Sequence, residues 1–290
     1  MSSAKGLAYE VHDVFAEAPR EGNPVAVVFG AARLSGDEMQ ALARETNLSE
    51  TTFVLHDAAR DGAFDVRIFT PGAELPYAGH PTLGTAAAIR ARLLGGELDE
   101  LVLRLGVGPV RVRFASDGLA WLESPPARFE RFDDRASVAA ALGLPESALD
   151  PALPIELQTH GPKQLFAPLR ERAAVEAARV DAGAYDRLRA AGAPGSLYAF
   201  ARGARAPRNH FTVRLFAPAL GVPEDPATGS AAGFLGAYLA RHRVLGDAAV
   251  DVRLEQGHAL RRPSLLHVRA RGEVVHVGGR VIPAARGEWL

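Results

Sequence analysis

Short stretches of alternating apolar and polar residues dominate the chain and predict many strands. Phe64, Val66 and Ile68 are separated by Asp65 and Arg67, which is the two-residue period of a half-buried strand. Similar patterns, or short apolar and β-branched runs bounded by turn residues, predict the other strands. These lie at 8–15, 25–29, 51–55, 101–105, 110–114, 119–122, around 165, and at 197–201, 212–216, 250–254, 264–271 and 274–282.

Helical signals are fewer than strand signals. Ser35, followed three residues later by Glu38, forms a capping box, and Asn47 is suited to end that helix in the left-handed conformation. Two Ala-rich helices are predicted at 81–94 and 226–242, with a short one near 137–142. Many strands with few long helices favour an α+β fold over a doubly wound α/β fold.

The length of 290 residues favours two domains. Pro125-Pro126 interrupts the pattern, and the part that follows repeats the style of the first part. We therefore predict an N-terminal domain at 1–126, to which the C-terminal strand could return, and a C-terminal domain at 127–290.

An internal repeat links the two halves. RIFTP at 67–71 recurs as RLFAP at 214–218, and each is followed by a loop and a helix start, GHPTLGTAA at 79–87 and EDPATGSAA at 224–232. Aligned on their prolines, the two copies match His80 with Asp225 at an offset of 225 − 80 = 145 residues, half of the chain. Strand and helix start recur together, which indicates two pseudo-symmetric domains.

Each copy has the character of an anion site. Proline is favoured at the first helical position, and small residues behind it (Gly84 in one copy, Gly229 and Ser230 in the other) leave backbone N–H groups accessible to a carboxylate. Asp225 could instead be an ordinary N-cap, and the glycines could serve only tight packing. Because capping does not require a repeat, the two copies favour a cleft between the domains, with His80 and Asp225 facing a substrate.

Composition removes several classes of function. Lys and Arg number 33 against 34 Asp and Glu, so no basic surplus points to nucleic acid. The absence of cysteine excludes disulfides, thiolate metal sites and thiol catalysis. No histidine pattern suits a metal, no Gly-rich phosphate loop is present, and no apolar run is long enough to span a membrane. We expect no cofactor, no metal and no membrane association, and a cytoplasmic location, because the N-terminal sequence does not resemble a signal peptide.

Five runs carry a family resemblance: EGNPVAVVF, MQALARETNLSETTFVL, RIFTPGAELPYAGHPTLGTA, VRLFAPALGVPEDPATGSAAG and LEQGHALRRPS. They resemble the PhzF-like, phenazine-biosynthesis-type isomerase and epimerase family nearly from end to end. The resemblance implies a diaminopimelate-epimerase-like fold, in which each of two domains wraps a mostly antiparallel sheet or barrel around a central helix. It also implies a homodimer.

The resemblance also implies a set of site residues. The family's general acid/base maps onto Glu50, and the His of GHPT and the Asp of EDPATGS map onto His80 and Asp225. Substrate-binding residues are expected in the same runs, at Asn23, Ser49, Gly79, Gly229 and Ser230. Two departures from the family's pattern are Ala78, where many relatives carry Cys, and Arg261-Arg262, where the usual run reads Gly-Arg.

Electrostatics assign the roles within this set. A helix N-terminus favours the ionised form of a carboxylate and disfavours an imidazolium. We therefore expect Asp225 to be a poor base and His80 to be a neutral hydrogen-bonding group. Glu50 lies between a helix end and a strand, where a side chain can be held rigidly towards a cleft, although a solvated loop carboxylate would occupy the same place. A buried carboxylate can shuttle protons near neutral pH. We therefore assign the shuttle to Glu50, with His80 and Asp225 orienting the substrate and stabilising developing charge.

The function expected is a cofactor-independent isomerase that moves a proton, by a 1,3-shift or tautomerisation, on a small carboxylate substrate. Two alternatives remain open. One is a racemase or epimerase of an amino-acid-like compound, which without cysteine would have to pair Glu50 with His80 or Asp225. The other is a non-catalytic small-anion binding protein. The sequence does not identify the substrate.

Overall fold

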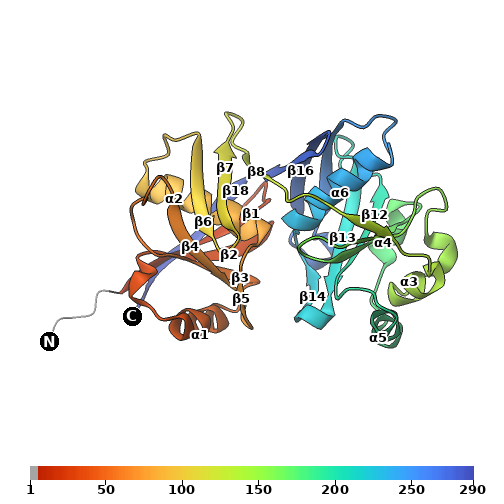
Figure 1. The fold of residues 1–290 in the computed structure, drawn as a ribbon, viewed down its shortest axis with the longest axis horizontal. Helices are drawn as coiled ribbons and strands as arrows, with labels where there is room; N and C mark the ends of the chain where they lie inside the picture. Colours follow the sequence, from red (N-terminus) through yellow and green to blue (C-terminus); the bar gives the residue numbers. More distant parts are fainter. Residues whose placement is uncertain (1–5) are drawn as a thin grey trace. The chain divides into compact units, whose positions relative to one another are not determined.

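The computed structural model describes residues 6–290 and divides the chain into two compact units (Figure 1). Unit 1 comprises the described residues up to Glu123 together with Gly278–Leu290, and unit 2 comprises Ser124–Val277. The chain therefore leaves unit 1 three residues before the predicted boundary at 126, and its last 13 residues belong to unit 1.

Unit 1 is built from nine strands and two α-helices. The strands are β1 (Leu7–Val14), β2 (Asn23–Val28), β3 (Glu50–Val54), β4 (Phe64–Phe69), β5 (Glu74–Leu75), β6 (Glu100–Leu105), β7 (Gly108–Phe114), β8 (Ala120–Glu123) and β18 (Val281–Trp289). The helices are α1 (Gly36–Thr46) and α2 (Gly79–Leu93), with a short 3₁₀ helix at Ala31–Arg33. The predicted capping box at Ser35 and Glu38 is present, and Asn47 ends α1 with a φ of 50°.

Unit 2 is built in the same way, with additional helices. Its strands are β9 (Phe129–Arg131), β10 (Glu156–Gln158), β11 (Gln164–Pro168), β12 (Leu197–Arg202), β13 (Phe211–Ala217), β14 (Val222–Asp225), β15 (Val250–Gln256) and β16 (Ser264–Arg271). Its helices are α3 (Arg135–Ala141), α4 (Arg172–Ala177), α5 (Ala182–Ala190) and α6 (Gly229–Arg241). β17 (Val274–Gly279) begins in unit 2 and ends in unit 1.

The strand pairings reveal the repeat directly. In unit 1, β1 pairs antiparallel with β2, β2 parallel with β3, β3 antiparallel with β4, and β4 parallel with β6 and antiparallel with β5. The strands β10 to β15 of unit 2 pair in the same order and with the same directions. Antiparallel pairs predominate in both units, so the predicted α+β fold with a mostly antiparallel sheet in each half is confirmed.

One long helix lies against the sheet of each unit. In α2, ten of the fifteen residues are buried, and the helix contacts β1, β2, β3, β6, β7, β8 and β18. In α6, nine of the thirteen residues are buried, and the helix contacts β15 and β16. A helix that is apolar on most of its surface is stable only when it is enclosed. The sequences of α2 and α6 are both rich in the small residues Ala and Gly.

The repeated RIFTP and RLFAP segments form the same contacts in both units. Arg67 on β4 donates Nε and Nη2 to the two carboxylate oxygens of Glu74 on β5, both at 2.7 Å. Arg214 on β13 makes the same bidentate pair with Glu224 on β14, at 2.9 and 2.7 Å. In each unit the guanidinium also lies over the ring of the phenylalanine two residues further on. The repeat thus conserves a charged clamp between neighbouring strands.

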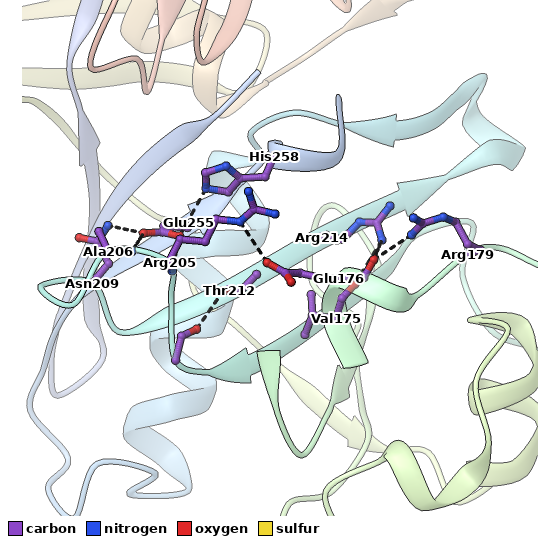
Figure 2. Close-up of polar contacts among 11 residues, drawn as sticks. Val175, Glu176, Arg179, Arg205, Ala206, Asn209, Thr212, Arg214, Glu255 and His258 are labelled. Atoms are coloured by element: carbon purple, nitrogen blue, oxygen red, sulfur yellow. Dashed lines mark hydrogen bonds and ion pairs between the residues drawn. The ribbon is translucent and has the colours of Figure 1, made fainter. Parts of the chain in front are cut away.

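Arg214 has a further role that Arg67 does not share. Its Nη1 donates to the carbonyl oxygen of Ala178 at 2.6 Å. It also donates to the carbonyl oxygens of Val175 and Glu176 at 3.2 and 3.3 Å; Figure 2 shows Arg214 beside these two residues. Val175 and Glu176 lie in the last turn of α4, and Ala178 is its C-cap residue. Carbonyl groups at a helix C-terminus have few partners within the helix. Arg214 therefore fastens a helix that unit 1 lacks to the repeated strand.

Three sequence predictions of local structure are corrected. α2 begins at Gly79, so Pro81 is its third residue, and α6 begins at Gly229, three residues after Pro226. Pro fits anywhere in the first helical turn because none of these N–H groups has an intrahelical partner. The strand predicted at 274–282 is broken at Arg280, whose carbonyl accepts hydrogen bonds from two N–H groups of the chain after β1.

Gly84 serves packing, which corrects its expected place in an anion cradle. It lies in the second turn of α2, and a Cβ atom there would stand 2.4 Å from Cγ1 of Val25 and 2.9 Å from Cγ2 of Val14. The helix can approach β1 and β2 only because this side chain is absent.

We predict that Gly84→Ala destabilises the protein by about 1–3 kcal/mol, because overpacking a close contact outweighs the better helix propensity of alanine. Gly183→Ala in α5 is the matched control, since its Cβ would meet only ordinary contacts at 3.4 Å and beyond. That variant should be neutral or slightly stabilised. Urea unfolding of both variants measures the difference, and equal stabilities would contradict the packing role.

Candidate active site

Glu50 is held by the parallel pair of β2 and β3. It is the first residue of β3 and pairs in register with Val25, directly after the loop that follows Asn47. Its side chain is largely buried, with 16% of its surface exposed. The sequence places the carboxylate at the start of a rigid strand, and the fold encloses it without removing all access.

His80 meets Glu50 from the central helix. As the second residue of α2, it brings Nε2 to 3.3 Å from Oε2 of Glu50, and its own side chain is only 6% exposed. Burial lowers the pKa of His80 to about 3, against a weaker opposing effect of a hydrogen bond to the backbone of Pro24. The imidazole is therefore neutral at physiological pH, as predicted from its position at a helix start.

Asn23 completes a three-residue group in unit 1. Its Nδ2 lies 3.3 Å from Nδ1 of His80, and its residue is fully buried. It is the first residue of β2, which begins two residues before the strand predicted at 25–29. The structure thus joins Asn23, His80 and Glu50 in one line of polar contacts. The role of Asn23 in binding substrate stays a prediction.

The remaining unit 1 candidates lie beside this group. Ser49 immediately precedes Glu50 and is half-buried, and Gly79 is the first residue of α2. The N-cap of this helix is Ala78, which has no side chain able to cap it. Tyr77, which the sequence did not single out, has a buried hydroxyl with no hydrogen-bond partner among the described residues, and burial raises its pKa.

In unit 2, Asp225 is buried at the end of β14, ahead of α6. It is therefore a strand residue, and the N-cap of α6 is Thr228. The hydroxyl of Thr228 donates to Oδ2 of Asp225, and Nε2 of Gln256 donates to the backbone carbonyl of Asp225 at 2.8 Å. Neither Thr228 nor Gln256 was recognised from the sequence; the partners of Gln256 lie in another segment of the chain.

Gly229 and Ser230 are the first two residues of α6, which was predicted to begin at Pro226. The hydroxyl of Ser230 lies 3.4 Å from Nε2 of Gln164 on β11. The oxygen of that amide and the hydroxyl of Tyr198 are buried and have no hydrogen-bond partner among the described residues. Burial, together with the charge of Asp225, raises the pKa of Tyr198, so its phenol stays protonated.

Glu255 anchors the loop that follows β12. It accepts hydrogen bonds from the backbone N–H groups of Arg205 and Ala206 and from Nδ2 of Asn209, at 2.7 to 2.9 Å, and His258 lies 3.3 Å away (Figure 2). Burial alone would raise its pKa, but these hydrogen bonds and the nearby histidine hold the pKa of Glu255 below its usual value. The carboxylate is a fixed anchor for this loop.

Both departures from the family pattern now have a position. Ala78 is the N-cap of α2, and Arg261 adopts a φ of 56°. This is the left-handed region, where glycine is favoured and other residues are strained by roughly 1–2 kcal/mol. The positive φ explains why glycine is usual at that position, and Arg261 adopts the same backbone conformation at a cost in strain.

Within residues 6–290, no cluster of three or more His, Asp or Glu side chains is arranged to hold a metal ion. No helix in the same range has the length and apolar character needed to cross a membrane.

The comparisons with known proteins define the class first. The chain is 40% identical to trans-2,3-dihydro-3-hydroxyanthranilate isomerase of Pseudomonas aeruginosa, over 96% of this chain and 98% of that one. It is 34% identical to the uncharacterised isomerase YddE of Escherichia coli O157:H7, over 98% of both chains. The protein is an isomerase, and the anion-binding alternative is set aside.

A family model described as phenazine biosynthesis-like protein (PhzC-PhzF) matches residues 12–287. The chain therefore belongs to the PhzF family. A solved PhzF-family structure from Bacillus anthracis covers 99% of both chains at 26% identity with a TM-score of 0.87. A hydroxyproline epimerase from Agrobacterium vitis matches at 13% identity and a TM-score of 0.60, which extends the likeness of fold to epimerases.

The buried neutral His80 predicts a dependence of stability on pH. Below its ordinary pKa of 6.5, the unfolded chain binds a proton that the folded protein excludes until about pH 3. Above pH 6.5 this group therefore causes no proton-linked loss of stability. As the pH falls from 6.5 towards 3 it lowers the free energy of unfolding, by roughly 2 kcal/mol between pH 7.5 and 5.

Replacing His80 with Asn should make the unfolding free energy fall less steeply over that interval. Urea unfolding at pH 7.5, 6 and 5 measures the slope, with the exposed His160→Asn as the control. A His80→Asn slope equal to that of the wild type would mean that His80 titrates normally in the folded protein.

Proposed function

We propose that the protein catalyses a proton-transfer isomerisation of a small carboxylate, with Glu50 as a general acid/base and without a cofactor. The observation that carries the proposal is the contact between Glu50 and a neutral His80, 3.3 Å apart and both largely buried. A group that removes a proton from carbon and returns it elsewhere must alternate between two protonation states. A neutral imidazole can hydrogen-bond to either state of the carboxyl group without pinning it as an anion.

The proton balance of such a reaction is simple. Glu50 takes a proton from a carbon of the substrate, and the electron pair moves into the adjacent unsaturated system. The carboxylic acid of Glu50 then returns the proton to a different carbon of the same molecule. Bonds shift but the composition of the substrate does not change, so neither an oxidant nor a second substrate is needed.

We assign the substrate carboxylate to the N-terminal turns of α2 and α6. Thr228 makes no side-chain cap on α6, and Ala78 cannot cap α2, which leaves first-turn N–H groups of both helices without a side-chain acceptor. Gly229 and Ser230 in α6, and Gly79 in α2, supply such groups to an anion. Ser49 beside Glu50 is a further substrate contact in this proposal. The expectation that the two half-sites act together between the domains stays a prediction.

The duplicated strands favour one base over two. In unit 1, Phe53 pairs with Arg67, and in unit 2, Ala199 pairs with the equivalent Arg214. Three residues earlier in the chain are Glu50, the first residue of β3, and Ser196, which directly precedes β12. Serine is not a proton shuttle at neutral pH, so unit 2 has no counterpart of the Glu50 carboxylate at this position. A two-base racemase or epimerase of an amino-acid-like compound is therefore the second candidate, supported by fold likeness alone.

A carboxylated ring is the substrate class that we propose. The relative from P. aeruginosa bears the name of its substrate, trans-2,3-dihydro-3-hydroxyanthranilate, and it matches the present chain along nearly its whole length. This compound is the first to be assayed, and stable 3-hydroxyanthranilate, the aromatic compound with the same substituents, serves as a binding probe.

We predict that Glu50→Gln lowers kcat/KM by at least about 10³-fold, because the amide keeps the shape but cannot titrate. Incorporation of deuterium from heavy water should fall equally, whereas binding of 3-hydroxyanthranilate, measured by calorimetry, should change little. The exposed Glu45→Gln in α1 is the matched control and should retain wild-type turnover. Near wild-type turnover of Glu50→Gln together with an inactive His80→Asn would make His80 the base.

We also propose a homodimer, on the family resemblance. Light scattering at micromolar concentration should give twice the chain mass of 30.7 kDa. A mass equal to one chain at that concentration would exclude a stable dimer.

A further inference from the structure

The end of β15 reaches the turn that connects Asp225 with α6. Gln256, the last residue of β15, is 1% exposed. Its Nε2 donates to the carbonyl oxygen of Asp225 at 2.8 Å and to Oγ1 of Thr228 at 3.1 Å, and its Oε1 accepts from the backbone N–H of Thr228 at 3.2 Å. One amide side chain therefore binds both ends of the four-residue segment Asp225–Thr228.

The neighbouring glycine makes this approach possible. Gly257 has a φ of 78°, and a Cβ atom there would lie 2.6 Å from the carbonyl oxygen of Pro226 and 2.1 Å from that of Arg262. A side chain at this position would push β15 away from the segment. The backbone geometry thus brings Gln256 against Asp225–Thr228 and keeps it there.

The hydrogen bonds have a fixed direction. An amide NH₂ group only donates, so the hydroxyl of Thr228 is the acceptor in its contact with Gln256. The single proton of that hydroxyl is then directed to Oδ2 of Asp225, which accepts it. The donor and acceptor are therefore fixed in both hydrogen bonds, from Gln256 to Thr228 and from Thr228 to Asp225. This fixes the orientation of the carboxylate.

The same arrangement withdraws Thr228 from the usual task of an N-cap residue. Thr at this position normally accepts a hydrogen bond from the first turn of the helix. Here its side chain makes no cap hydrogen bond to α6. The hydroxyl donates to Asp225 instead, and the backbone N–H of Thr228 donates to Oε1 of Gln256.

We infer that Thr228 and Gln256 are positioning residues of the isomerase, which hold the carboxylate of Asp225 in the orientation used with the substrate. This inference rests on the proposed role of Asp225 in orienting the substrate. Because the two residues act through Asp225 and not on the substrate itself, their loss should lower kcat more than it raises KM.

The first test compares Thr228→Val with Thr228→Ser. Valine keeps the shape and removes the hydroxyl, so kcat should fall about 10- to 100-fold, the scale of a small misplacement of a reacting group, with KM changed less than about threefold. Serine keeps the hydroxyl and should restore kcat to within about threefold of wild type. An unchanged kcat in Thr228→Val, or a loss in Thr228→Ser as large as in Thr228→Val, would overturn the inference.

A double-mutant cycle tests whether the effect passes through Asp225. Thr228→Val added to Asp225→Asn should cause no further loss of kcat, whereas independent effects would multiply. Multiplying effects would overturn the inference. The Glu50→Gln variant, which decides the proposed function, enters no arm of this cycle, so the two proposals can fail separately.

Gln256→Leu is compared with a matched glutamine in the same unit. Gln158 is fully buried and also makes three hydrogen bonds: it donates Nε2 to two backbone carbonyls and accepts one backbone N–H, whereas Gln256 donates to one backbone carbonyl and one hydroxyl. Gln256→Leu should lower kcat about 10- to 100-fold, and Gln158→Leu, at a similar loss of thermal stability, should keep kcat within about twofold of wild type. Equal losses of kcat in both variants would mean that Gln256 only stabilises the fold. If neither folds, the Thr228 pair still decides.

Discussion

Burial of His80 beside Glu50 is the constraint on which the proposed chemistry of this protein depends. The imidazole is carried into the interior by α2, a helix enclosed on most of its surface, and it cannot leave water without losing its charge. A cationic histidine 3.3 Å from Glu50 would hold that carboxyl group as a permanent anion. A neutral one allows the carboxyl group to gain and lose a proton. The packing of α2 thereby sets the electrostatics of the site.

The two units share their strand framework but differ in the polar residues of the candidate site. Both units repeat the order of parallel and antiparallel strand pairs, and both keep an arginine–glutamate clamp between neighbouring strands. The polar residues differ at equivalent places: His80 corresponds to Asp225, and Glu50 corresponds to Ser196. The clamp serves the strands, so it recurs in both units, whereas the proton transfer that we propose needs only one carboxyl group.

Local signals explain which elements could be predicted from the sequence. The first helix was bounded correctly because Ser35, Glu38 and Asn47 act within a few residues of one another. The start of α6 was misjudged because Thr228 is fixed by Gln256, 28 residues away. β9, β10, α4 and α5 were missed, since short Ala- and Arg-rich segments such as Arg172–Ala177 show little periodicity.

The site shows the same division. The repeat drew attention to His80 and Asp225, and the family resemblance added Glu50, but no spacing in the sequence brings Glu50 to His80. Their contact depends on the parallel pairing of β2 with β3 and on the docking of α2. Gln256 was overlooked for the same reason, because its partners lie on another segment.

The protonation state of His80 tests the account most directly. Histidine labelled with ¹⁵N in the ring, assigned by comparison with His80→Asn, reports by NMR whether each ring nitrogen carries a proton. The account predicts one protonated and one bare nitrogen on His80 throughout the range from pH 8 to pH 5, because burial excludes the imidazolium. Two protonated nitrogens at pH 6 would contradict it, since Glu50 would then face a cation and could not act as the acid/base described here.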